Sequence, residues 1–288
     1  MTTVGLLGTG LMGRAIAERL HAVHHSVIVY NRTAARALSL QSLGVTVVTL
    51  PEQAVVQTDV ILLVLADAAA IQAVLLTPAV TKVLGGKTIV QMGTIAPDES
   101  KAIQREVERF GGTYCEAPIL GSLVEAKSGT LQVMVGGTDE LFSRWFPLFR
   151  SLSREPRLIG PVGTAAALKL ALNQLIAAEI SAFALSLALI QKAGVPVDTF
   201  MTILRESALF APSFEKKLPR LLKRDYHNPN FSTRHLLKDV ELFLAEAIKQ
   251  RLTVTSLEGI VPILQKTIDH GLGEVDYSAI YDVIHPPR

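Results

Sequence analysis

The chain has 288 residues, 49% of them hydrophobic, which suffices for one large domain or two ordinary ones with a sizeable core. A formal net charge of +2, with basic residues scattered rather than clustered, argues against a nucleic-acid-binding surface, so no nucleic-acid partner is expected. The single cysteine, Cys115, rules out an intrachain disulfide. Together with an N-terminus that reads as a strand rather than a signal peptide, this predicts a cytoplasmic protein.

In the first half of the chain, short apolar runs alternate with helical patterns. The predicted strands are 4–7, 26–30, 45–48, 59–65, 88–91, 113–116, 131–135 and 157–159, and the predicted helices are 11–20, 33–43, 97–110 and 139–152. Strands that are apolar on both faces and alternate with helices are typical of a parallel sheet covered on both sides. The pattern therefore predicts an α/β Rossmann-type domain with a mostly parallel sheet over residues 1–161.

After the Gly160-Pro161-Val162-Gly163 segment the chain carries only helical patterns. They cover 164–193, 196–206, 213–223, 232–249, 256–270 and 276–283 and predict an all-α domain over residues 162–288, joined by a long interdomain helix. Polar residues interrupt the apolar stretch 165–191, and its longest unbroken part, about eleven residues, is too short to span a bilayer. We expect a buried helix, no membrane partner, and a homodimer or homotetramer with helical domains in contact, because one small domain cannot bury so apolar a helix.

Residues 5–15, GLLGTGLMGRA, carry three glycines with the spacing G-x-G-x-x-G between a predicted strand and a predicted helix. This context is the one that the dinucleotide-binding fingerprint requires, whereas the spacing alone would fit a structural turn. In the fingerprint the first glycine makes the turn, the second admits the pyrophosphate and the third lets helix and strand pack. The predicted cofactor-binding residues of the loop are Gly8, Thr9, Gly10, Leu11, Met12 and Gly13.

The residues after the second predicted strand indicate which dinucleotide binds. NAD sites place Asp or Glu there to bind the ribose 2′-hydroxyl, but this chain has Asn31, Arg32 and Thr33. Arg32 can pair with a 2′-phosphate and stack on adenine, and Asn31 and Thr33 can add hydrogen bonds, although Thr33 can equally cap its own helix. The sequence therefore predicts NADP(H) as the cofactor.

Lys169 and Asn173 are four residues apart on the long apolar helix and therefore share one face. A lysine ammonium can protonate the alkoxide formed when hydride reaches a carbonyl, and the neutral amine can accept that proton in the reverse direction. Asn173 could orient the lysine or bind substrate. Helical spacing alone leaves a second interpretation open, in which the lysine extends its head group to water beside a polar neighbour.

Four stretches resemble the β-hydroxyacid dehydrogenases, the family that contains 3-hydroxyisobutyrate dehydrogenase. They are GLLGTGLMG, EAPILGSLVEAKSGTL (116–131), GPVGTAAALKLALNQ (160–174) and LLKDVELFLAEA (236–247), in the family's order along the chain. The resemblance implies that Lys169 is the catalytic acid or base and Asn173 its partner. It also implies cofactor contacts from Leu65, Ala66, Thr94 and Lys238, and substrate contacts from Thr94, Leu120, Gly121, Ser122, Lys169, Asn173 and Asp239.

One residue departs from the family pattern. The family usually has serine where this chain has Leu120, and that hydroxyl helps to hold the substrate carboxylate, so Gly121 N–H, Ser122 and Thr94 remain as candidate anchors. Asn31-Arg32-Thr33, Gly121-Ser122, Phe231 and the closing GLGEVDYSAIYDVI (271–284) resemble the NADPH-dependent glyoxylate and succinic semialdehyde reductases. In that branch Phe231 matches a position in the substrate pocket.

The leading hypothesis is an NADPH-dependent reductase of small aldehyde or keto acids, such as glyoxylate or succinic semialdehyde. The alternatives are an oxidative 3-hydroxy acid dehydrogenase of the 3-hydroxyisobutyrate type, an imine reductase, which Leu120 allows and Lys169 disfavours, and a non-catalytic NADP-binding protein. No metal is expected, since His21, His24 and His25 are interpreted as solvent-exposed or as interacting with a helix C-terminus. Cys115 is interpreted as a buried bystander and Glu116 as a structural hydrogen-bond acceptor.

Overall fold

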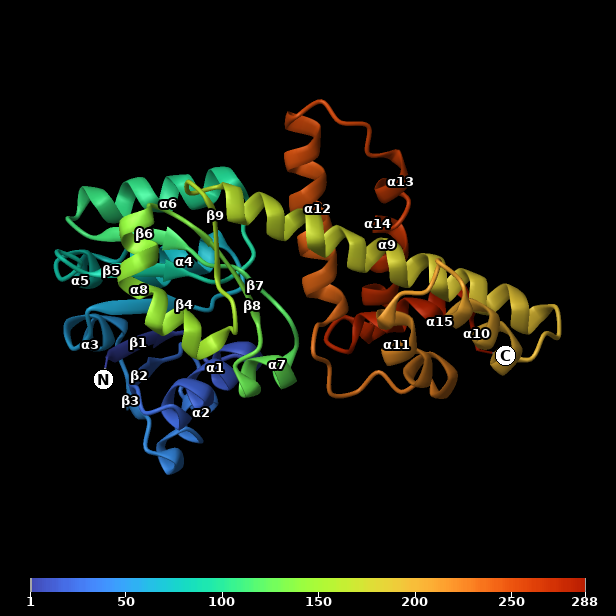
Figure 1. Cartoon of the computed structure of the whole chain (residues 1–288), viewed down its shortest axis with the longest axis horizontal. Helices are drawn as coiled ribbons and strands as arrows, with labels where there is room; N and C mark the ends of the chain where they lie inside the picture. The colour runs from blue at the N-terminus through green and yellow to red at the C-terminus, as the bar shows by residue number, and fades with distance from the viewer. Residues whose placement is uncertain (1, 288) are drawn as a thin grey trace. The chain divides into compact units, whose positions relative to one another are not determined.

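The computed structural model describes residues 2–287 and divides into two compact units, Met1–Lys169 and Leu170–Arg288. The division falls inside helix α9 (Thr164–Lys192), whose first residues belong to the sheet-bearing unit. Figure 1 shows α9 as one unbroken helix, in yellow.

The first unit is built on a nine-stranded sheet. Its parallel part has the order β3-β2-β1-β4-β5-β6, formed by Thr46–Val48, Ser26–Tyr30, Thr3–Leu7, Val60–Leu63, Thr88–Gln91 and Thr113–Glu116. Strand β8 (Gln132–Gly136) runs antiparallel to β6 and carries β7 (Ile119–Leu120) and β9 (Arg157–Gly160). This strand order is that of the Rossmann fold, so the predicted fold class is confirmed.

Helices cover both faces of this sheet (Figure 1). One core contains α1 (Leu11–Ala22), α7 (Leu123–Ser128) and α8 (Asp139–Leu152), packed through residues such as Ile16, Leu20 and Phe149. The other contains α3 (Pro51–Val56), α4 (Ala68–Leu75), α5 (Pro78–Thr81) and α6 (Pro97–Arg109), packed through residues such as Ile71 and Ile103. Buried apolar residues on both faces explain why the strands read as continuous hydrophobic runs.

The second unit is helical. After α9 it contains α10 (Val197–Glu206), α11 (Pro212–Lys223), α12 (Thr233–Lys249), α13 (Thr255–Glu258), α14 (Val261–Thr267) and α15 (Ile280–Ile284). Its core gathers Phe183 and Leu187 of α9, Leu236 of α12 and Ile280 of α15. The prediction that the second part of the chain is all-helical is therefore confirmed.

Two predicted helices are interrupted. The helix predicted over 33–43 is only α2 (Ala35–Leu38) and a 3₁₀ turn, Gln41–Leu43. The helix predicted over 256–270 stops after α13, restarts at α14 beside Pro262 and ends in a π-helical segment, Ile268–Leu272. In that segment Gly271 has a φ of +81°. Proline lacks the N–H that would continue a helix, and the positive φ breaks the helical path.

Helix α9 is buried on one face only. Leu185 is 63% exposed and Leu189 68% exposed, so the expectation of a buried helix fails for this face within a single chain. By length and composition α9 would be long enough and apolar enough to cross a membrane, with a mean hydropathy of 1.6 in its most apolar window. Core helices of soluble proteins can have the same length and composition. Helix α9 therefore exposes an apolar face within the single chain.

Candidate active site

The glycine loop after β1 is closely packed at two of its three glycines. Gly8 has a φ of +105°, and its N–H donates to the Tyr30 carbonyl at 2.9 Å. A Cβ on Gly8 would overlap the Val64 carbonyl oxygen, and one on Gly13 would overlap the Gly8 carbonyl oxygen. Only glycine fits at these two positions, so the loop can pass tightly from strand to helix.

The N-terminus of α1 is left open for an anion. Gly10 is its N-cap residue, no side chain caps it, and its first turn, which is fully described, carries no acidic residue. A Cβ added at Gly10 would meet nothing within 4 Å. By contrast, Asp67 caps α4 by accepting a hydrogen bond from the Ala70 N–H at 2.7 Å. The free N–H groups and the helix dipole of α1 therefore fit the pyrophosphate of a dinucleotide.

The residues after β2 comprise a half-buried asparagine, which links two segments of backbone, and an exposed basic edge. Asn31 Oδ1 accepts a hydrogen bond from Thr9 N–H, and Asn31 Nδ2 donates to the Thr33 carbonyl, both at 2.9 Å. Asn31 thus holds the glycine loop to the end of β2. Arg32 and Thr33 are exposed, as is Arg36 in α2, which the sequence pattern did not indicate. Thr33 does not cap α2, because the N-cap residue is Ala34.

The loops after β4 and β5 meet beside the glycine loop. A Cβ on Gly93 would overlap the Leu65 carbonyl oxygen, so the two loops touch through their backbones. Leu65 and Ala66 come after β4, and Thr94 comes after β5. The carboxyl ends of β1, β4 and β5 thereby bring their predicted cofactor-binding residues to one edge of the sheet, where ligands bind in open α/β sheets.

In the turn after β7, one of the hydroxyl groups predicted to hold the substrate already donates its hydrogen bond within the protein. Leu120 is half-buried, and Gly121 has a φ of +139°. Ser122 is the N-cap residue of α7. Its hydroxyl donates to Glu125 Oε2 at 2.5 Å, and its N–H donates to the same oxygen at 2.7 Å. The only proton of the Ser122 hydroxyl is therefore given to Glu125. Leu120 has no side-chain donor, and of the predicted anchors in this turn the side chain of Ser122 already donates to Glu125.

In the helical unit, Asn173 and Lys238 are linked by a buried carboxylate. Asn173 Nδ2 donates to Asp239 Oδ2 at 2.6 Å, and Lys238 Nζ lies 2.9 Å from Asp239 Oδ1. Asp239 is 2% exposed and Asn173 3% exposed. Within the described chain, Asn173 Oδ1 is buried without a hydrogen-bond partner, so it is oriented to accept a hydrogen bond from a bound molecule.

Lys169 is one helical turn before Asn173 and is 9% exposed. A lysine that extends its head group into water would be far more exposed, so the structure disfavours that interpretation. A buried lysine on the same helix face as a fixed asparagine is suited to proton transfer.

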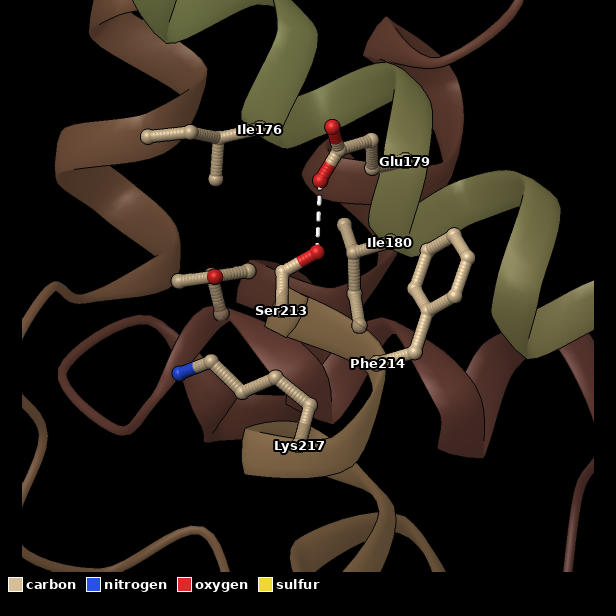
Figure 2. A pocket seen from close by; sticks show the side chains of 7 residues that line it. Ile176, Glu179, Ile180, Ser213, Phe214 and Lys217 are labelled. Atoms are coloured by element: carbon tan, nitrogen blue, oxygen red, sulfur yellow. Dashed lines mark hydrogen bonds between the residues drawn. The ribbon is translucent and has the colours of Figure 1, made fainter. Parts of the chain in front are cut away.

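Phe231 lies beside a small cavity of the helical unit. Its ring packs edge-on against Tyr277, with centroids 5.9 Å apart. Tyr277 lines a cavity of about 40 Å³, together with Ile176, Glu179 and Ile180 of α9 and Ser213, Phe214 and Lys217 of α11. Figure 2 shows Ser213 donating to Glu179 across it, at 2.5 Å. A space of this size holds a few water molecules and excludes a cofactor.

The other side chains considered from the sequence do not form a second site. Cys115 is fully buried, and burial raises the pKa of its thiol to about 12, so it is not a nucleophile at neutral pH. The His25 ring Nε2 lies 2.9 Å from Ser151 Oγ. Across residues 2–287, no three His, Cys, Asp or Glu side chains gather as metal ligands.

Two family models match the chain, one after the other. The model described as the NAD binding domain of 6-phosphogluconate dehydrogenase matches residues 3–163, which is more than half of the chain. The model described as NAD-binding of NADP-dependent 3-hydroxyisobutyrate dehydrogenase matches residues 163–284. Together they account for the sheet-bearing part and for the helices that come after it.

Known proteins match over almost the whole chain. Glyoxylate/succinic semialdehyde reductase 1 of Arabidopsis thaliana is 29% identical over 98% of both chains. The 2-hydroxy-3-oxopropionate reductase of Escherichia coli K12 is 30% identical over 98% of this chain and 96% of its own. The structure of 3-hydroxyisobutyrate dehydrogenase from Salmonella typhimurium has a TM-score of 0.89 at 21% identity, covering 98% of this chain and 100% of that one. At this identity, the structural likeness shows the fold.

Proposed function

From the premise that this chain belongs to the β-hydroxyacid dehydrogenase family, and is therefore an NAD(P)-dependent oxidoreductase of hydroxyl or carbonyl groups, we propose a specific activity. The protein reduces small aldehyde or keto acids to hydroxy acids with NADPH, and Lys169 is the proton donor. The observation that carries the proposal is the buried Lys169 one turn from Asn173, whose amide is fixed by Asp239.

Each residue has a separate task in this proposal. A nicotinamide cofactor, when bound, supplies the hydride. Lys169 gives its ammonium proton to the carbonyl oxygen as negative charge develops there. Asn173 Oδ1 accepts a hydrogen bond from the ammonium or from the product hydroxyl, and Asp239 keeps the Asn173 amide in that orientation. Lys238, held by Asp239, is proposed to reach the cofactor.

The choice of NADPH over NADH is proposed from the exposed edge after β2. Arg32 and Arg36 present two guanidinium groups there, with no carboxylate in the Asn31-Arg32-Thr33 segment. A guanidinium pairs with a phosphate through two parallel hydrogen bonds, whereas a carboxylate would repel it. The second matching family model is described as NAD-binding of NADP-dependent 3-hydroxyisobutyrate dehydrogenase, which supports this choice.

The activity is tested by following NADPH and NADH oxidation with glyoxylate, succinic semialdehyde and a cyclic imine. Turnover of an aldehyde acid with NADPH supports the proposal. Turnover of the imine alone would instead favour an imine reductase, an alternative that Leu120 and the engaged Ser122 hydroxyl keep open. Oxidation of 3-hydroxyisobutyrate in preference to any reduction would favour the 3-hydroxy acid dehydrogenase. NADPH binding without turnover of any substrate would indicate a non-catalytic binding protein.

Restoring a hydroxyl at position 120 should improve the use of acids. In Leu120→Ser, the new hydroxyl can donate to a substrate carboxylate, so we expect the KM for glyoxylate to fall about tenfold with little change in kcat. Steady-state kinetics measures both constants. Val124→Ser, at a side chain of α7 that is 71% exposed, is the matched control and should leave the KM within about twofold of its original value. An unchanged KM in Leu120→Ser would show that the carboxylate is not held at this turn.

We further propose that the protein is a cytoplasmic homo-oligomer, without nucleic-acid or membrane partners, in which a second copy covers the exposed face of α9. The net charge of +2 and the buried, unpaired Cys115 support the location. Leu175, Leu185 and Leu189 are 48%, 63% and 68% exposed on one helix, which is the composition expected of a subunit interface.

Charge placed on this face should separate the copies. Leu185→Glu/Leu189→Glu is expected to halve, or reduce further, the mass measured by light scattering after gel filtration, because two carboxylates cannot be buried unpaired in the interface. Leu38→Glu, at a leucine of α2 that is 52% exposed, is the control and should keep the original mass. A monomeric parent protein would refute the proposal.

A further inference from the structure

The start of α9 cannot cap itself. Gly163 precedes the helix with a φ of +102°, and its carbonyl accepts the first intrahelical bond from the Ala167 N–H at 3.0 Å, so it is the N-cap residue. A capping box needs a side-chain acceptor at the N-cap for the third helical N–H, and another at the third helical residue for the N-cap N–H. Here these residues are Gly163 and Ala166, which have no side-chain acceptor.

Glu116 supplies both halves of this capping box from the sheet. It ends β6, is 1% exposed, and its Oε1 accepts hydrogen bonds from the Gly163 N–H at 2.8 Å and the Ala166 N–H at 2.9 Å. One carboxylate oxygen thus satisfies the two backbone donors that a local serine and glutamate satisfy in an ordinary helix. A negative charge at this end also interacts favourably with the helix dipole.

The second carboxylate oxygen is fixed by a chain of hydroxyl groups. Ser100 of α6 donates to Glu116 Oε2, and the Ser100 and Tyr114 hydroxyls are 2.8 Å apart. Because the proton of Ser100 goes to Glu116, Tyr114 must be the donor to Ser100. Burial raises the pKa of Tyr114, so its hydroxyl keeps the proton that this chain requires. On the other side, a Cβ on Gly136 would lie 2.5 Å from Glu116 Oε1, so the carboxylate occupies the space that a side chain at position 136 would need.

We propose that Glu116 is a positioning residue, which sets the place of the Lys169 amine by holding the first turn of α9 to strands β6 and β8. The inference rests on the proposed role of Lys169. Lys169 is three residues after Ala166, less than one helical turn from the last bond to Glu116. Burial raises the pKa of Glu116, and the hydrogen bonds from Ser100 and the helix N–H groups counteract that effect. The role depends on the two accepted hydrogen bonds, so glutamine, which keeps the acceptor, should preserve it.

The test compares Glu116→Ala with Glu116→Gln in the full-length protein. NADPH titration gives the number of binding sites and Kd, which depend on the glycine loop, and steady-state kinetics with the aldehyde acid gives kcat per site. In Glu116→Ala we expect kcat per site to fall about 30-fold, because displacing a reacting group by a fraction of an ångström slows the reaction strongly. The Kd of NADPH should stay within about twofold of the value for the parent protein. Glu116→Gln should recover most of the loss. Gly136→Ala, which displaces the carboxylate without removing it, should reproduce the loss.

Hydrogen exchange at the start of α9 provides a readout that is independent of turnover. The Gly163 and Ala166 amides should exchange about tenfold faster in Glu116→Ala and return towards the original rates in Glu116→Gln. Thr138→Ala is the matched control, since it removes the cap of α8, where the Thr138 hydroxyl accepts from Leu141 N–H at 3.2 Å, and should leave kcat per site and the α9 amides unchanged.

Three results would overturn the inference. The first is a kcat per site in Glu116→Ala that stays within threefold of the parent value. The second is an equal loss of kcat per site in Glu116→Gln and Glu116→Ala. The third is a loss of total activity that is fully accounted for by a loss of NADPH-binding sites. If the parent protein reduces no carbonyl compound, the proposed function fails. The exchange rates then decide separately whether Glu116 holds the helix.

Discussion

Replacing Lys169 with alanine should lower kcat for glyoxylate reduction about 10³-fold, because the developing alkoxide loses its proton donor. The cofactor loop is made by β1 and α1, far along the chain from this lysine, so NADPH should bind with an unchanged Kd. The measurement is single-turnover NADPH oxidation in the presence of saturating aldehyde. A normal Kd with slow hydride loss would locate the defect in the chemical step.

Lys192→Ala is the matched control for this variant. Lys192 ends the same helix but is exposed, so its loss removes a charge without touching the buried group around Asn173. It should retain the original kcat. If Lys169→Ala kept more than a tenth of the activity, the proton would have to come from water or from another side chain, and the assignment of Lys169 would be wrong.

Replacing Arg32 with alanine should raise the Kd of NADPH about 100-fold and leave that of NADH nearly unchanged. A charge-assisted pair with the 2′-phosphate contributes about 1.5–3 kcal/mol to the binding free energy, and the upper part of this range corresponds to about 100-fold in Kd. NADH lacks the phosphate and therefore cannot make this pair. Fluorescence titration with each dinucleotide gives the two constants.

The two neighbouring arginines can be separated by the same titration. Arg36→Ala should lose less NADPH affinity than Arg32→Ala if Arg36 attracts the phosphate only at long range. Arg154→Ala, at an exposed arginine elsewhere in the sheet-bearing unit, should lose no NADPH affinity. An equal loss of NADPH and NADH affinity in Arg32→Ala would mean that the guanidinium stacks on adenine and does not read the phosphate.

Much of the fold could be predicted because its main elements carry strong local signals. Strands 26–30 and 88–91 and the helix 139–152 have the predicted bounds. The elements that were missed, α3, α4, α5, α7 and β7, are only two to eight residues long, too short for hydrophobic periodicity to show. The interruption near Pro262 had a local signal, since proline at this point was visible in the sequence.

The site was only partly accessible from sequence. Lys169 and Asn173 can be paired from helical spacing, but the bond from Asn173 to Asp239 joins residues 66 positions apart, and only the family resemblance pointed to Asp239. The engaged Ser122 could have been foreseen, because Ser122 and Glu125 have the S-x-x-E spacing of a capping box. The cap on α9 could not have been foreseen, because Glu116 is 47 and 50 positions from the two residues whose N–H groups donate hydrogen bonds to it.

The close contact between Gly136 and Glu116 also constrains how this sequence can evolve. A side chain at position 136 is harmful while a glutamate occupies position 116, but a shorter acid there would make room for it. The two positions should therefore show strong epistasis, with the double change tolerated better than the sum of the single changes. A shorter acid alone would reach the Gly163 and Ala166 N–H groups less well, so neither single change is neutral and the two positions are expected to change together.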